Sequence, residues 1–331
     1  MTKPSEYFKD LCGHEAVKRQ LEAAVSSGRI GHAYIFSGPS GVGRYTAALA
    51  FAGAVVGTDK ENHPDIITVT NELYSVKSKS DSILVETIGE MRRDIFIKPY
   101  SAAHKVYIIP KADTMNAASQ NKLLKVLEEP PSYCTMILIA ENKSKLLPTV
   151  LSRTSEISFS PLPAGDVADY LMSRLGAAAD KAAACAAISG GSIGQAKLIL
   201  KNSSVISLRD EAIEKVIALK SSKNRVIFEL AKFIKDNKND IDYILTILRS
   251  IFDDAVHLKL GLTEKLANID KRGELSEFAG RITSRSAVNL LDITAKYEKV
   301  FKSNANFRIS AFCISCEYWE ELHGRNYRST I

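Results

Sequence analysis

The fold of this chain is decided by the stretch from Lys105 to Arg153, which reads KVYIIPKADTMNAASQNKLLKVLEEPPSYCTMILIAENKSKLLPTVLSR. Val106–Ile109 is a short apolar run of the kind that is buried on both faces of a parallel sheet. Ala117–Glu128 has leucines at helical spacing and is stopped by a Pro-Pro pair. Met136–Ala140 is a second apolar run. The order strand, helix, strand predicts a right-handed crossover in an open α/β sheet, whose ligand- and partner-facing residues lie beyond the carboxyl ends of the strands.

A glycine-rich turn lies between a predicted strand, Tyr34–Ser37, and a predicted alanine-rich helix, Tyr45–Val56. This is the context that a phosphate-binding loop requires, but such a loop ends in Lys and then Ser or Thr, and here Arg44 and Tyr45 stand there. Arginine does not replace the compact lysine charge, and a phenol cannot replace the hydroxyl that holds Mg²⁺. Any remaining phosphate contacts, weak or none, are expected from the residues of the turn, Gly38, Gly41, Gly43 and Arg44.

Two boxes carry a family resemblance. Asn121–Pro131 reads NKLLKVLEEPP, and Leu147–Arg153 reads LPTVLSR. In this order and spacing they resemble the AAA+ subunits of the bacterial DNA polymerase III clamp loader. Three shorter segments support the resemblance, which covers about the first two hundred residues well and the rest by length and helicity: GHEAV at 13–17, HPD at 63–65 and IKPY at 97–100.

The resemblance implies a role for Arg153. In that family the arginine of a Ser-Arg-Cys motif is an arginine finger, which enters the ATP site of the neighbouring subunit. Ser152 and Arg153 match the motif, and Thr154 replaces the cysteine. We therefore expect Arg153 to act in trans, with Ser152 supporting it. The alternative is that Arg153 is an ordinary surface cation at a strand edge.

Two further positions differ from the active members of the family. Their strand matching Val106–Ile109 runs directly into Asp-Glu, whereas this chain has Pro110-Lys111 and then Asp113. Active members also carry a phosphate-sensing arginine near the position of Gln195. In this chain, a turn capped by Ser192 is enough to explain the segment. The resemblance implies a subunit without ATPase activity of its own. The alternative is an active AAA+ ATPase, either a motor subunit of the same loader or a related DNA-processing enzyme.

Glu128 and Glu129 are unusual in position. Acids at the carboxyl end of a helix oppose its macrodipole. They are either solvated or paired with cations on a neighbouring subunit, and both readings stay open.

Composition bounds the class of protein. With 331 residues, 45% of them hydrophobic and 25% charged, the chain is a globular protein of two or three domains. The 44 basic residues exceed the 38 acidic ones only mildly, which permits contact with nucleic acid without establishing it. No apolar run is long enough for a membrane helix, the first residues do not resemble a signal peptide, and the odd count of cysteines favours free thiols, so a cytoplasmic location is expected.

The chain is predicted to have three parts. An AAA+ core of the P-loop type, 1–160, has a parallel sheet flanked by helices. A small helical lid, 161–204, follows a linker at Pro161–Pro163, and an all-α collar, 205–331, serves oligomerisation. Apolar residues from Ile241 to Leu258 follow the i, i+3, i+4 pattern of an amphipathic helix and support the collar.

No metal and no resident cofactor are expected, although nucleotide binding without hydrolysis stays open. Clamp-loader subunits of this kind often insert a four-cysteine zinc module before the HPD segment, but Gly57–Asn62 contains no cysteine. Cys313 and Cys316 lie in an apolar helical stripe and are interpreted as buried thiols rather than a metal or redox pair. The resemblance implies ATPase subunits of the gamma/tau type and a delta subunit as partners. It also implies the sliding clamp, primer–template DNA reached through the complex, and no membrane.

Overall fold

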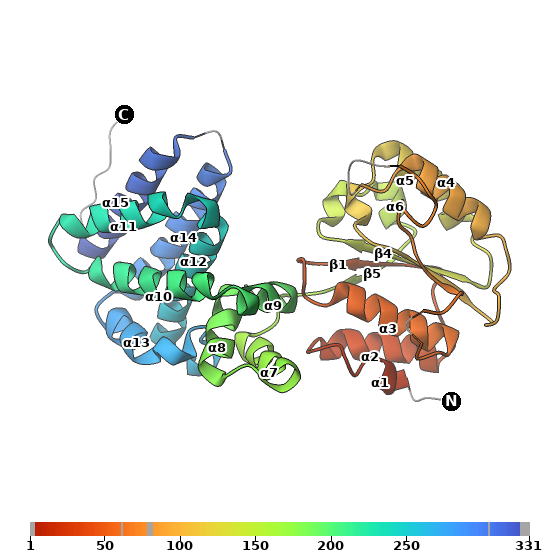
Figure 1. Cartoon of the computed structure of the whole chain (residues 1–331), viewed down its shortest axis with the longest axis horizontal. Coiled ribbons are helices and arrows are strands. Elements are labelled where there is room, and N and C mark those ends of the chain that lie inside the picture. Colours follow the sequence, from red (N-terminus) through yellow and green to blue (C-terminus); the bar gives the residue numbers. More distant parts are fainter. Residues whose placement is uncertain (1–3, 61, 78–81, 304, 325–331) are drawn as a thin grey trace. The chain divides into compact units, whose positions relative to one another are not determined.

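The computed structural model describes residues 4–60, 62–77, 82–303 and 305–324 (Figure 1). The chain forms two compact units, Met1–Pro161 and Leu162–Ile331. The predicted lid and collar both lie in the second unit, and their separation at residue 204 stays a prediction.

The first unit is built on a sheet of parallel strands, as predicted. Its strand order is β2-β3-β4-β1-β5. The three predicted strands are confirmed, each extended at its start by one or two residues: β1 Ala33–Ser37, β3 Lys105–Ile109 and β4 Cys134–Ala140. The sheet also contains β2 Ile66–Thr68 and β5 Ser155–Ser158. Strand β5 was not predicted, because Ile157 is its only buried residue and the sequence there has no apolar run.

Alternate side chains of the central strands supply two cores. Tyr34 and Phe36 face one core, whereas Ala33 and Ile35 face the other. Figure 1 shows the helices on both sides of the sheet: α1 (Pro4–Tyr7), α2 (Glu15–Ser26) and α3 (Arg44–Val56) on one face, and α4 (Val85–Asp94), α5 (Ala117–Glu128) and α6 (Pro148–Leu151) on the other. Each buried aliphatic or aromatic side chain contributes roughly 1.5–3 kcal/mol of burial free energy.

One predicted helix is shorter than expected. The amphipathic pattern of Phe8–Gly28 predicts a helix over these residues, but α2 begins only at Glu15. Gly13 and His14 interrupt it, because both have left-handed backbone conformations, with φ of 61° and 56°.

The second unit is entirely helical over its described residues, as predicted for the lid and collar. Its helices are α7 (Ala164–Leu175), α8 (Ala179–Ile188), α9 (Ile193–Lys201), α10 (Ser203–Ala218), α11 (Arg225–Asp236), α12 (Ile241–Lys259), α13 (Arg272–Gly280), α14 (Ser284–Phe301) and α15 (Phe307–His323). Ser192 caps α9 by accepting a hydrogen bond from the Gln195 amide at 3.1 Å, which confirms its predicted role. Ile244, Leu248 and Ile251 of α12 are fully buried, as their spacing predicts. Over the described part of the chain, no helix has the length and apolarity needed to cross a membrane.

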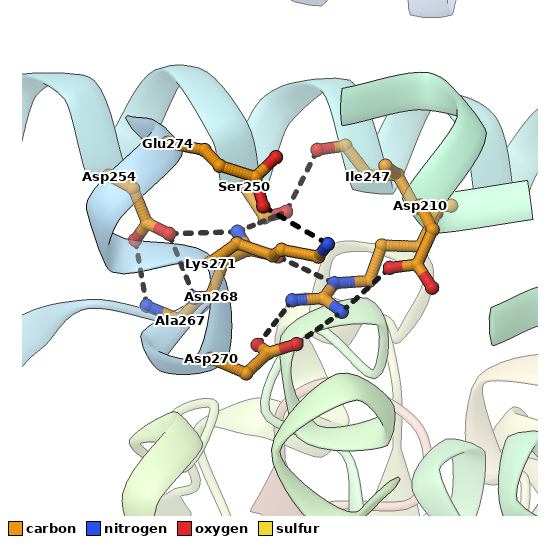
Figure 2. A network of polar contacts seen from close by, with 10 residues as sticks. Asp210, Ile247, Ser250, Asp254, Ala267, Asn268, Asp270, Lys271 and Glu274 are labelled. Atoms are coloured by element: carbon orange, nitrogen blue, oxygen red, sulfur yellow. Dashed lines mark hydrogen bonds and ion pairs between the residues drawn. The ribbon is translucent and has the colours of Figure 1, made fainter. Parts of the chain in front are cut away.

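A buried polar network joins α10, α12 and the short turn η5 (Ile269–Lys271) (Figure 2). Arg209 is 1% exposed, and its Nη1 and Nη2 atoms bind Asp270 at 2.9 and 2.5 Å. Its Nε donates to Asn268 Oδ1 at 2.8 Å, and Asn268 Nδ2 donates to Asp254 at 2.8 Å. Burial raises the pKa of Asp254 above its ordinary value, although hydrogen bonds from Ala267 and Asn268 act in the opposite direction. These contacts fix the turn around η5 to two helices.

Candidate functional site

Arg153 lies in the turn between α6 and β5. Its Nη1 donates to the Thr149 carbonyl at 3.1 Å and contacts Ser152 Oγ at 3.3 Å. Ser152 Oγ in turn donates to the same carbonyl at 3.1 Å. The two predicted residues therefore lie together at the end of α6, and Ser152 touches the guanidinium directly.

An ion pair holds the other side of this guanidinium. Nη2 of Arg153 lies 3.0 Å from Oε1 of Glu128, the last residue of α5. The two side chains are 37% and 50% exposed. Glu128 thus meets a cation of its own chain, an outcome that the sequence interpretation did not include. The only signal for it was the unfavourable position of an acid at a helix carboxyl end.

The predicted phosphate-loop residues Gly38, Gly41, Gly43 and Arg44 form one turn between β1 and α3. The backbone requires glycine at two of these positions. Gly38 has φ of 142°, and an added Cβ would lie 2.2 Å from the Phe159 carbonyl oxygen. Gly43 has φ of 108°, and its Cβ would lie 2.9 Å from Leu11. These glycines are explained by close packing of the turn, whether or not it holds phosphate.

Arg44 is buried at the start of α3. It is 7% exposed, and its Nη2 lies 3.6 Å from Glu141 Oε1. Its Nε and Nη1 atoms are buried without a hydrogen-bond partner. Burial lowers the pKa of Arg44, and the negative charges of Glu141 and Asp113 partly offset this. The unpartnered donors suit an anion, but a carboxylate of the same chain already lies beside this guanidinium.

The positions that would bind Mg²⁺ carry other groups. Tyr45 OH is 3.1 Å from Thr68 Oγ1, so the phenol is hydrogen-bonded across the end of β2. Strand β3 leads into Pro110 and Lys111, and the nearby Asp113 carboxylate accepts a hydrogen bond from the Asn142 amide at 3.1 Å. Magnesium prefers several oxygen ligands in octahedral geometry. These residues therefore do not fit a Mg²⁺–nucleotide.

Elsewhere in the described residues, no group of three or more His, Cys, Asp or Glu side chains is placed to hold a metal ion. Cys313 and Cys316 are half-buried rather than buried, which corrects that part of the sequence interpretation. They lie on α15, whose buried face is formed by other residues such as Ile314 and Tyr318. Burial raises the pKa of the Cys316 thiol to about 11, so it is protonated at neutral pH.

The HPD and IKPY segments are joined through Asp65. This carboxylate is fully buried and accepts hydrogen bonds from the amides of Tyr100, Ser101 and Ala102, at 2.5, 2.9 and 2.9 Å. Burial alone would raise the pKa of Asp65, but the three amides outweigh it and hold the pKa below the ordinary value. The two motifs therefore form one structural tie, which fixes the chain ahead of β3.

Replacing Asp65 with asparagine is expected to destabilise the first unit by about 2 kcal/mol at neutral pH, because an amide cannot accept all three hydrogen bonds. An acid whose pKa is lowered by folding stabilises the fold above its unfolded pKa of about 3.8, and this contribution is lost as the pH falls through the folded value. The difference in the free energy of unfolding between wild type and variant should therefore shrink below that pH. Thermal unfolding by circular dichroism and hydrogen exchange at residues 100–102 measure both effects.

Asp113→Asn provides the control, since that carboxylate accepts the Asn142 amide and is only partly buried. It should cost much less stability. Equal losses in the two variants, or a gap that does not change with pH, would contradict the role given to Asp65.

Two family models match the chain. The model described as "DNA polymerase III, delta subunit" matches residues 13–163, and "DNA polymerase III, delta subunit, C terminal" matches residues 204–309. DNA polymerase III subunit delta′ of Bacillus subtilis is 27% identical over 88% of this chain and 91% of its own length. DNA polymerase III subunit tau of the same organism is 33% identical, over 46% of this chain and 29% of its own. A solved structure of a gamma subunit-related protein from Thermotoga maritima is similar at 17% identity, with a TM-score of 0.43, over 92% of this chain and 99% of that one.

Proposed function

The chain belongs to the family of DNA polymerase III clamp-loader subunits, as a homologue of subunit delta′, and from this premise we propose that it does not hydrolyse ATP itself but supplies Arg153 to the ATP site of a neighbouring subunit. In this way it would help load the sliding clamp on primed DNA during replication.

The proposal rests on a contrast between two sites of the first unit. Ser152 and Arg153 are present, and the guanidinium is held at the surface with part of it open to solvent. The chain's own nucleotide loop instead has a buried Arg44 beside Glu141 and no residues that fit Mg²⁺. A guanidinium can stabilise the charge on a transferring phosphoryl group of another subunit without any ATP chemistry in its own chain.

The proposed partners follow from the family. They are ATPase subunits of the gamma/tau type and a delta subunit, together with the sliding clamp and primer–template DNA met through the assembled complex. Contacts with DNA would go to phosphates through backbone amides, Lys and Arg, without reading the base sequence.

The purified chain is expected to show no ATP turnover above background, with or without primed DNA. Its glycine-rich turn ends in Arg44 and Tyr45 rather than in Lys and then Ser or Thr, and Pro110-Lys111 stand where active members have Asp-Glu. A steady-state phosphate-release assay measures this, beside a gamma/tau-type subunit as the positive control. The complex assembled with the chain should turn over ATP in response to primed DNA. If the isolated chain hydrolyses ATP, and this activity follows it through purification at constant specific activity, the alternative function of an active AAA+ ATPase would be favoured.

A further inference from the structure

We propose that Glu128 is a positioning residue for Arg153: its carboxylate fixes the orientation in which the guanidinium is offered to the neighbouring ATP site. This inference rests on the proposed function of Arg153 as a finger in trans.

The guanidinium is held on two edges. Nη1 is bound by α6 itself, through the Thr149 carbonyl and Ser152 Oγ. Nη2 is bound by Glu128 from α5, at 3.0 Å. Arginine has five N–H donors in a planar fork, so among the described contacts Nε and one hydrogen of Nη2 remain for an outside acceptor. The fork is therefore constrained in direction while part of it stays available to a phosphate.

Hydrogen bonds also tie together the two segments that carry this pair. Gln120 of α5 is 2% exposed, and its side chain ties the helix to the segment that starts α6. Its Oε1 accepts from the Leu147 amide at 2.7 Å, and its Nε2 donates to the Lys145 carbonyl at 3.1 Å. Part-buried hydrogen bonds thus join α5, which ends at Glu128, to the segment before α6, and Arg153 lies in the turn that follows α6. A group held this way is preorganised, which is the condition for electrostatic stabilisation of a transition state.

Stability of the chain does not explain the pair. Ion pairs with both partners this exposed contribute little to folding. An acid in the last turn of α5 is also unfavourable for that helix, because it lies at the negative end of the macrodipole. The contact instead restricts the rotamers of Arg153, which has a long and flexible side chain. Without the contact, this conformational freedom would have to be lost during phosphoryl transfer.

The adjacent acid provides a matched control. Glu129 is exposed and carries the same charge one position along, but the ion pair of Arg153 is with Glu128. Glu128→Gln and Glu129→Gln therefore change the net charge of the surface equally, and only the first removes the ion pair, leaving at most a weaker neutral hydrogen bond to Arg153.

The test is DNA-stimulated ATP turnover in a clamp loader reconstituted with cognate partners, for wild type, Glu128→Gln, Glu129→Gln, Arg153→Ala and the double variant Glu128→Gln/Arg153→Ala. Assembly is checked by gel filtration. In single-turnover hydrolysis, Glu128→Gln is expected to slow the phase that is lost in Arg153→Ala on the order of tenfold, with the KM for ATP nearly unchanged. Glu129→Gln should behave as wild type. In the Arg153→Ala background, Glu128→Gln should cause no further loss.

Three outcomes would overturn the inference while leaving the finger in place: equal rates for the two glutamine variants, a loss from Glu128→Gln that persists without Arg153, or a faster rate. The last would mean that Glu128 competes with phosphate for the guanidinium. A failure of the proposed function is distinguishable, because then Arg153→Ala itself would leave turnover unchanged in an intact complex.

Discussion

Replacing Arg153 with alanine is expected to lower ATP turnover at the neighbouring site that it enters by about 10³-fold, the lower end of the range for arginine fingers supplied in trans. The physical reason is that a fixed positive charge is lost where negative charge spreads over the transferring phosphoryl oxygens. The measurement is single-turnover ATP hydrolysis by the reconstituted complex with primed DNA. In a ring with several ATP sites, one phase of hydrolysis should disappear while the others remain.

Two variants show whether the effect belongs to a finger. Arg153→Lys keeps the charge but loses the planar fork, so an intermediate rate is expected. Arg93→Ala removes another exposed arginine of the same unit, which is paired with Glu90 at 2.7 Å, and should leave turnover within about twofold, as for an ordinary surface pair. If Arg153→Ala and Arg93→Ala behave alike in complexes that assemble equally, Arg153 is a surface cation, the reading that the sequence also allowed.

The elements of the first unit could largely be predicted because their signals are local. Strands β3 and β4 are apolar runs, and α5 matches its predicted bounds, Ala117–Glu128, with a Pro-Pro stop after it. Where a signal is weak, prediction fails: β5 has one buried residue, and the start of α2 depends on the left-handed conformation of His14. The residue type at one position does not predict a left-handed backbone conformation.

The candidate site could be predicted as a set of residues but not as a set of contacts. The boxes Asn121–Pro131 and Leu147–Arg153 were visible in the sequence, yet the Glu128–Arg153 pair depends on how α5 packs beside α6. The same holds for Glu141 beside Arg44 and for Thr68 beside Tyr45, where the partner comes from another strand end. Contacts of this kind are set by tertiary packing, which local patterns do not encode.

In the second unit, Asp270→Ala is expected to lower the free energy of unfolding by about 3 kcal/mol, because Arg209 is 1% exposed and would be left as a buried charge without its bidentate partner. Trp319 is the only tryptophan of the chain and is buried in α15 of this unit, so its fluorescence during urea unfolding reports the second unit alone. The transition should move to lower urea with an unchanged slope, as for a loss of stability without a change in the surface exposed.

Asp210 offers the matched control for this experiment. It lies 3.4 Å from the same guanidinium but is 50% exposed, so Asp210→Ala should cost no more than about 0.5 kcal/mol. The double variant Arg209→Met/Asp270→Leu removes both charges and should regain part of the loss, since well-packed apolar groups often replace a buried pair without cost. Equal effects of Asp270→Ala and Asp210→Ala would contradict the argument that burial sets the energy of these contacts. A double variant as unstable as Asp270→Ala would show instead that the shape of the turn around η5, rather than its charge, holds α10 to α12.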